Sequence, residues 1–190
     1  MFRISGSGAG GQKAAIIGAG VRGLKRRELP FLAAAATVLG LDQLTKAVVS
    51  RTMEVGQYFP SDDWPLRLHY VTNTGAAFGI LQDQTAFLIV TSIIGIAAIV
   101  YYWLSQRQPW PTALALGMML GGAAGNLLDR VRLGHVVDFL SFPHYPSFNV
   151  ADSSIVVAFV VLIGYHLLWE EKERQKVPEG VGREDPGADG

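Results

Sequence analysis

The chain has 190 residues, of which 49% are hydrophobic and 17% charged, with equal numbers of acidic and basic side chains. No charged residue occurs from Gln84 to Gln106 or from Gln108 to Leu128, and each stretch is long enough for a helix to cross a ~30 Å hydrocarbon core. This pattern excludes an ordinary soluble domain. The absence of cysteine excludes disulfides, thiolate nucleophiles and cysteine-ligated metals.

Residues 1–28 are rich in glycine and basic side chains, which predicts a flexible tail. The run Gly18-Ala-Gly-Val-Arg-Gly23 has the form G-x-G-x-x-G, but a dinucleotide site also needs a surrounding βαβ unit. A basic cluster and an apolar segment follow instead, so we expect no nucleotide there. The same stretch imitates a signal peptide. We favour an uncleaved first membrane span because its polar residues have a functional explanation.

Hydropathy predicts four membrane spans, at about residues 29–50, 84–106, 109–129 and 152–170. A charged tail follows at 171–190, so the domain organisation is a tail, a membrane domain over 29–170 and a second tail. Residues 53–82 mix glycine and proline with alternating runs, which predicts a small sheet on the membrane surface. Residues 131–149 combine two prolines with aromatic side chains, and we expect a re-entrant or half-helix segment. The expected fold is a membrane all-α core of four transmembrane helices with a small extracytoplasmic β-sheet.

Basic residues cluster before the first span, after the last span and around Arg107 between the second and third. By the positive-inside rule, both termini and this short loop face the cytoplasm. The segments 53–82 and 131–149 then face the outer side. Glycines recur every four residues in the third span, at Gly117, Gly121 and Gly125, and predict close helix packing.

Two spans carry polar residues that could serve a site. Asp42 and Lys46 stand four apart in the first span, so they share a helical face and can form an ion pair or position a substrate. Asn126, Asp129 and Arg130 form one polar edge at the end of the third span, where structural capping and substrate contact are both open. Before the second span, the segment from Asn73 to Gly79 is either a peptide-binding stretch or a turn.

Asp138 and Asp152 are fourteen positions apart in apolar surroundings, beside the fourth span. Ionisable residues at membrane depth indicate function. Two carboxylates that share a proton can activate water and protonate a peptide carbonyl, as in an aspartic peptidase. The spacing equally allows a proton or ion relay, or simple capping roles.

Taken together, the motifs resemble those of lipoprotein signal peptidase, or signal peptidase II, a bacterial aspartic endopeptidase family of the inner membrane. The resemblance extends over about residues 30–170. It rests on five motifs that occur in order: Asp42-Gln-Leu-Thr-Lys46, Asn73-Thr-Gly-Ala-Ala-Phe78, Gly121-Gly-Ala-Ala-Gly-Asn126-Leu-Leu-Asp129-Arg130, Val136-Val-Asp138-Phe139 and Phe148-Asn-Val-Ala-Asp152-Ser153.

The resemblance implies that Asp138 and Asp152 are catalytic and that no metal or cofactor takes part. It implies a prolipoprotein substrate whose cysteine carries diacylglycerol, cleaved just before that cysteine at the outer face of the membrane. We expect a monomer in the lipid bilayer with no nucleic-acid partner. The matching positions that approach the substrate are Asn126, Arg130 and Asn149, and those that shape the site are Asp42, Lys46, Asn73 and Asp129.

The alternative function is a small proton-coupled transporter that uses the intramembrane aspartates as a relay. Such transporters often contain internal repeats with broken helices, and the sequence shows no such repeat. A serine peptidase is a third possibility, but the chain has no G-x-S-x-G elbow, and its four histidines do not form an H-E-x-x-H metal motif.

Overall fold

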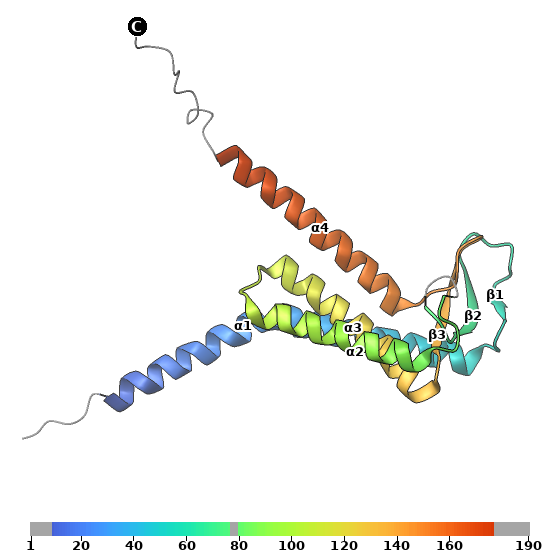
Figure 1. The fold of residues 1–190 in the computed structure, drawn as a ribbon, viewed down its shortest axis with the longest axis horizontal. Helices are drawn as coiled ribbons and strands as arrows, with labels where there is room; N and C mark the ends of the chain where they lie inside the picture. The colour runs from blue at the N-terminus through green and yellow to red at the C-terminus, as the bar shows by residue number, and fades with distance from the viewer. Residues whose placement is uncertain (1–8, 77–79, 177–190) are drawn as a thin grey trace, which may run out of the picture.

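The computed structural model describes residues 9–76 and 80–176, with side chains described for 28–76 and 80–168. Within these residues the chain forms four helices and three strands. In chain order they are α1 (Ala9–Thr52), β1 (Tyr58–Phe59), β2 (Arg67–Asn73), α2 (Thr85–Ser105), α3 (Trp110–Leu133), β3 (Val136–Ser141) and α4 (Val150–Lys176). The sheet lies at one end of the helices (Figure 1).

Each helix contains a segment long and apolar enough to cross a membrane, as the sequence predicts. These segments are Glu28–Thr52, Thr85–Ser105, Trp110–Leu133 and Val150–Leu168. Most large apolar side chains of α2 remain exposed, including Ile93 and Ile94. A helix that is apolar on all sides is suited to a lipid environment rather than to water.

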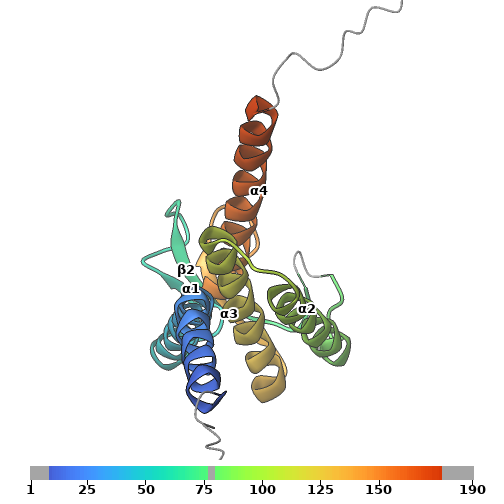
Figure 2. The ribbon, with the colours of Figure 1, turned by 90° about the vertical axis from the view of Figure 1, so that its left-hand side faces the viewer.

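Helix α3 is the central helix: it lies between α1 and α2 (Figure 2) and also contacts α4. Glycine makes these contacts possible on two faces. A Cβ atom at Gly121 would lie 2.5 Å from the carbonyl oxygen of Ala35 in α1, and one at Gly122 would lie 2.6 Å from that of Ala151 in α4. The predicted stripe of small residues therefore allows backbones to approach closely, as in other membrane helix pairs.

The three strands form one antiparallel sheet in the order β1-β2-β3. Val71 of β2 stands opposite Asp138 of β3. One face of the sheet packs on the end of α1 through a cluster of Val49, Tyr70, Val137 and Phe139. This packing fixes β3, and with it Asp138, relative to the first membrane span.

Two features differ from the sequence-based expectations. The expected re-entrant or half-helix segment contains strand β3, because its β-branched and aromatic run from Val136 to Phe139 pairs with β2. Helix α1 begins at Ala9, so residues 9–28 of the expected flexible tail are helical, whereas residues 1–8 lie outside the described part. Extending an existing helix by one residue is easier than nucleating a new one, which accounts for a helix that continues beyond its apolar span.

Candidate active site

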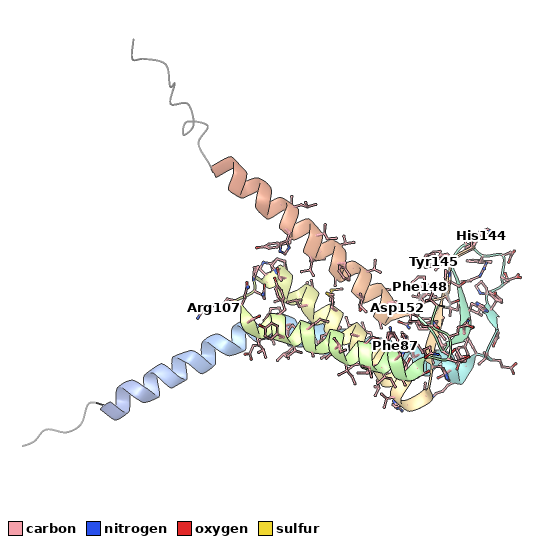
Figure 3. All side chains as sticks on the ribbon, in the orientation of Figure 1. Phe87, Arg107, His144, Tyr145, Phe148 and Asp152 are labelled. Carbon is pink, nitrogen blue, oxygen red and sulfur yellow. The ribbon has the colours of Figure 1, made fainter. Side chains whose placement is uncertain are left out.

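The two aspartates of interest lie at the sheet end of the helices. Asp138 is in the middle of β3 and Asp152 in the first turn of α4, where Figure 3 shows it beside Phe148. Both line one cavity of about 910 Å³, together with Asn73, Asn126 and Arg130. Residues separated by many positions in the sequence thus share a single wall.

A hydrogen-bonded cap at the start of α4 fixes Asp152. The side-chain oxygen of Asn149 accepts a hydrogen bond from the backbone N–H of Asp152 (3.0 Å), and Asp152 Oδ2 accepts one from the backbone N–H of Asn149 (3.3 Å). This reciprocal arrangement is a capping box, which satisfies two N–H groups that a helix start leaves free. The other carboxylate oxygen, Oδ1, accepts from the amide of Asn126 at 2.8 Å.

The side chain of Asn149 also connects the two aspartates. It is fully buried, and its amide donates to Asp138 Oδ1 at 2.7 Å. Asn73 donates to the second oxygen, Oδ2, at 3.0 Å. The carboxyl group of Asp138 therefore receives two amide donors, from β2 and from the residue before α4.

Burial dominates the protonation of Asp138. The residue is 2% exposed, and loss of water raises the pKa of its carboxyl group from 3.8 to about 7. The Asn73 and Asn149 amides stabilise the charged form and act against this shift in pKa, while the nearby Asp152 carboxylate adds to it. A carboxyl group with such a pKa can hold or release a proton near neutral pH.

A second polar cluster lies behind the aspartates. Lys46 forms ion pairs with Asp42 and Asp129, both at 2.9 Å, so the predicted i, i+4 pair is present. Each carboxylate also accepts a hydrogen bond from a backbone N–H. Asp42 accepts from Ala151 at 3.0 Å, and Asp129 accepts from Val137 at 3.2 Å. These two residues directly precede Asp152 and Asp138, so the cluster fixes the backbone beside both.

Asn126 joins this cluster to the aspartates. Its carbonyl oxygen accepts from Lys46 Nζ at 2.9 Å and from the Asn149 amide at 3.1 Å, while its own amide donates to Asp152. Lys46, Asn126 and Asn149 therefore form a continuous hydrogen-bonded path between the ion pairs and the cavity wall.

Comparison with known proteins identifies the family. The family model described as signal peptidase (SPase) II matches residues 34–168. The chain belongs to the signal peptidase II family. The recognition made from the sequence motifs is thus confirmed, and the chain is a membrane peptidase by its family.

Several members of the signal peptidase II family are similar to this chain over most of their length. The lipoprotein signal peptidase of Halothermothrix orenii is 40% identical over 136 residues, covering 72% of this chain and 92% of the relative. That of Caldanaerobacter subterraneus subsp. tengcongensis is 44% identical over 137 residues, covering 71% and 93%. That of Moorella thermoacetica is 40% identical over 152 residues, covering 79% and 100%.

Solved structures support the same fold. A bacterial membrane enzyme determined by the in meso method at 2.3 Å resolution matches with a TM-score of 0.69 and 30% identity, covering 80% of this chain and 94% of the other. A second, at 1.9 Å, matches with a TM-score of 0.66 and 33% identity, covering 72% and 92%.

Within this signal peptidase II fold, Arg130 lines the cavity and binds the chain before α2. Its Nη2 donates to the carbonyl oxygen of Gly75 at 3.2 Å. Asn73, two residues earlier, accepts from the backbone N–H of Gly75 at 2.9 Å. Residues 73–76 are therefore held against the cavity by two side chains, and residues 77–79 of the same segment lie outside the described part.

One polar residue of the site was not singled out from the sequence. Gln43 donates to Asp129 Oδ1 at 3.0 Å and to Asp42 Oδ2 at 3.2 Å, so it bridges the two carboxylates that flank Lys46. It stands three residues before Lys46, a spacing that places both on one helical face. That spacing was the sequence signal from which a role for Gln43 could have been predicted.

Three residues that line the cavity were also not predicted from the sequence: Tyr58, His69 and Ser147. Tyr58 and His69 stack there with ring centroids 3.9 Å apart, and His69 Nδ1 lies 3.3 Å from the hydroxyl of Ser147. Among the described residues, no group of three or more histidine, cysteine, aspartate or glutamate side chains is arranged to hold a metal ion.

Proposed function

We propose that this chain is an aspartic endopeptidase in which Asp138 and Asp152 form the catalytic pair. The observation that carries this proposal is that both carboxyl groups line one cavity and are tied together by Asn149. Aspartic peptidases need two carboxyl groups that share one proton, and a pKa of about 7 for Asp138 suits the protonated partner.

In the proposed reaction, Asp152 takes a proton from a water molecule as that water attacks the scissile carbonyl carbon. Asp138 gives its proton to the carbonyl oxygen, so a neutral tetrahedral intermediate forms. On collapse, the C–N bond breaks, the leaving nitrogen takes the proton from Asp152, and the hydroxyl returns a proton to Asp138. Both groups regain their starting state, and no covalent intermediate, metal or cofactor is required.

The proposed substrate is a bacterial prolipoprotein whose cysteine carries diacylglycerol, cut just before that cysteine. The relatives carry the name lipoprotein signal peptidase. Two acyl chains anchor a substrate in the bilayer by ~0.8 kcal/mol per buried CH₂, so the catalytic groups must lie where the lipidated residue sits. The cavity meets this requirement because it lies where the spans end and the sheet begins.

We propose that the enzyme spans the cytoplasmic membrane with both termini inside and the cavity at the outer face. The basic residues around Arg107 and at the chain ends support this orientation. We further propose that it acts as a monomer, since one chain by itself supplies both proposed catalytic carboxyl groups.

The test is cleavage of a diacylglyceryl-modified prolipoprotein by purified protein in detergent. Asp138→Asn and Asp152→Asn should each lower kcat by at least about 100-fold, because each removes one acid–base group with little change in shape. The matched control is Asp62→Asn, at an exposed position in the loop between β1 and β2. Full activity in either cavity variant would refute the catalytic pair.

A further inference from the structure

A second, smaller cavity lies at the same end of the helices. Its volume is about 300 Å³, and it is formed by the last turns of α1 and α3 with one residue of β3. It shares no lining residue with the larger cavity.

The charge in this cavity is unbalanced. Arg51 and Arg132 are exposed at its mouth and belong to no ion pair among the described residues. Lys46, at the floor, is neutralised by Asp42 and Asp129. Asp129 accepts hydrogen bonds from Gln43 and Val137 and pairs with Lys46, and it forms no ion pair with either arginine.

The cavity lies where two membrane spans end. Its helical lining residues belong to the last turns of the spans Glu28–Thr52 and Trp110–Leu133, where a span leaves the hydrocarbon core. A single arginine in a last helical turn can be explained by the partial negative charge of the helix end. Two such arginines facing one cavity at the end of two membrane spans match a ligand whose negative headgroup lies at the membrane surface.

We propose that this cavity binds the phosphate group of an anionic phospholipid. The planar guanidinium groups of Arg51 and Arg132 donate to phosphate oxygens, as arginine does in other phosphate sites. A headgroup that carries its own cation binds more weakly, because its positive charge faces two unpaired arginines.

The proposed lipid site contains neither catalytic aspartate, but it includes residues that fix the backbone beside Asp138. Asp129 and Val137 belong to this cavity, and Val137 directly precedes Asp138. Binding is nevertheless measurable without any cleavage assay, so its failure and that of the peptidase proposal are distinguishable.

The experiment measures binding of phosphatidylglycerol and phosphatidylethanolamine with matched acyl chains to the purified full chain in detergent, by native mass spectrometry. Phosphatidylglycerol should bind more tightly. The double variant Arg51→Gln/Arg132→Gln should bind it roughly 25-fold more weakly, from about fivefold for each arginine near an anionic headgroup. Arg107→Gln is the matched control, since Arg107 is exposed and lies at the opposite end of the helices (Figure 3).

Four results would overturn the proposal. The first is equal binding of the two lipids. The second is an equal loss of phosphatidylglycerol in Arg107→Gln, which would show charge attraction without a site. The third is displacement of the lipid by millimolar inorganic phosphate, which would show a site for the free anion. The variant Arg51→Lys/Arg132→Lys keeps both charges and should retain most of the affinity, and a loss as large as with glutamine would also contradict the assignment.

Discussion

The four acidic residues near the cavity have different kinds of partners. Lys46 lies between Asp42 and Asp129, whereas Asp138 and Asp152 receive hydrogen bonds from the amides of asparagines. The ion pairs with Lys46 suit a structural role for Asp42 and Asp129. Neutral amide donors orient a carboxylate yet allow it to take up a proton, which acid–base chemistry requires.

Asn73→Ala should move the alkaline limb of the pH–activity profile upwards. We expect activity to decline above about pH 7, where Asp138 loses the proton that the reaction needs. Asn73 donates to Asp138 Oδ2 and stabilises its charged form, so removing the donor raises the pKa of Asp138 further. A hydrogen bond to a charged group contributes ~1.5–3 kcal/mol, which corresponds to a displacement of about one pH unit or more.

The measurement is kcat/KM for the prolipoprotein substrate across pH, in which the position of the limb is separate from the overall rate. Thr72→Val is the control, because it changes the neighbouring cavity residue without touching Asp138's hydrogen bonds. A limb that stays in place or moves to lower pH in Asn73→Ala would show that Asp138 does not set it.

At the scale of the elements, the approach of α1 to α3 decides whether the ion-pair cluster can form. A Cβ atom at Gly125 would lie 2.5 Å from Asp42 Oδ2, closer than real contacts allow. Gly125→Ala should therefore displace Asp42 and weaken the hydrogen bond between its carboxylate and the backbone N–H of Ala151. We expect the free energy of unfolding to fall by about 1–3 kcal/mol, as at other overpacked sites, and the cleavage activity to fall with it.

Gly95→Ala in α2 is the matched control, because nothing lies within 4 Å of a Cβ atom there. Alanine favours a helix over glycine by roughly 0.5–1 kcal/mol, so this variant should be neutral or slightly stabilised. The check is a thermal melt in detergent together with the cleavage assay. If both alanine variants behaved alike, close packing at Gly125 would not matter.

The membrane helices and the local polar pairs could be predicted from the sequence, because both depend on short-range patterns. Hydropathy predicts the four apolar helices, and the spacing of four predicts the ion pair of Asp42 and Lys46. Strand β3 was not predicted, since a short apolar run between turns has no period that distinguishes a strand from a helix. Its conformation depends on pairing with β2, over 60 residues earlier.

The connections within the site could not be predicted for the same reason. The hydrogen bond from Ala151 to Asp42 joins residues 109 positions apart, and Gln43 reaches Asp129 across 86. Family motifs mark such residues without giving their partners. Only the packing of α1 and α4 on α3 shows that Asp42 and Asp129 hold the backbone beside the two aspartates.

At the scale of the whole molecule, both cavities and the sheet lie at one end of the spans, and the loop that contains Arg107 lies at the other (Figure 3). The proposed cleavage of a lipidated substrate at the outer face therefore requires the sheet to lie outside and this loop inside. The basic residues of the chain predict the same orientation.

Because the chain contains no cysteine, single-cysteine variants report this orientation without background labelling. Asp62→Cys lies in the loop between β1 and β2, and Gln108→Cys lies between α2 and α3. The labelling uses cells whose cell wall and any outer membrane have been removed and whose cytoplasmic membrane is intact. A membrane-impermeant maleimide should label the first variant within minutes and the second only after the cytoplasmic membrane is permeabilised. Labelling of both after permeabilisation shows that each thiol is reactive. The reverse pattern would place the cavity on the cytoplasmic side, where it could not meet a substrate at the outer face, and the proposed orientation would have to be abandoned.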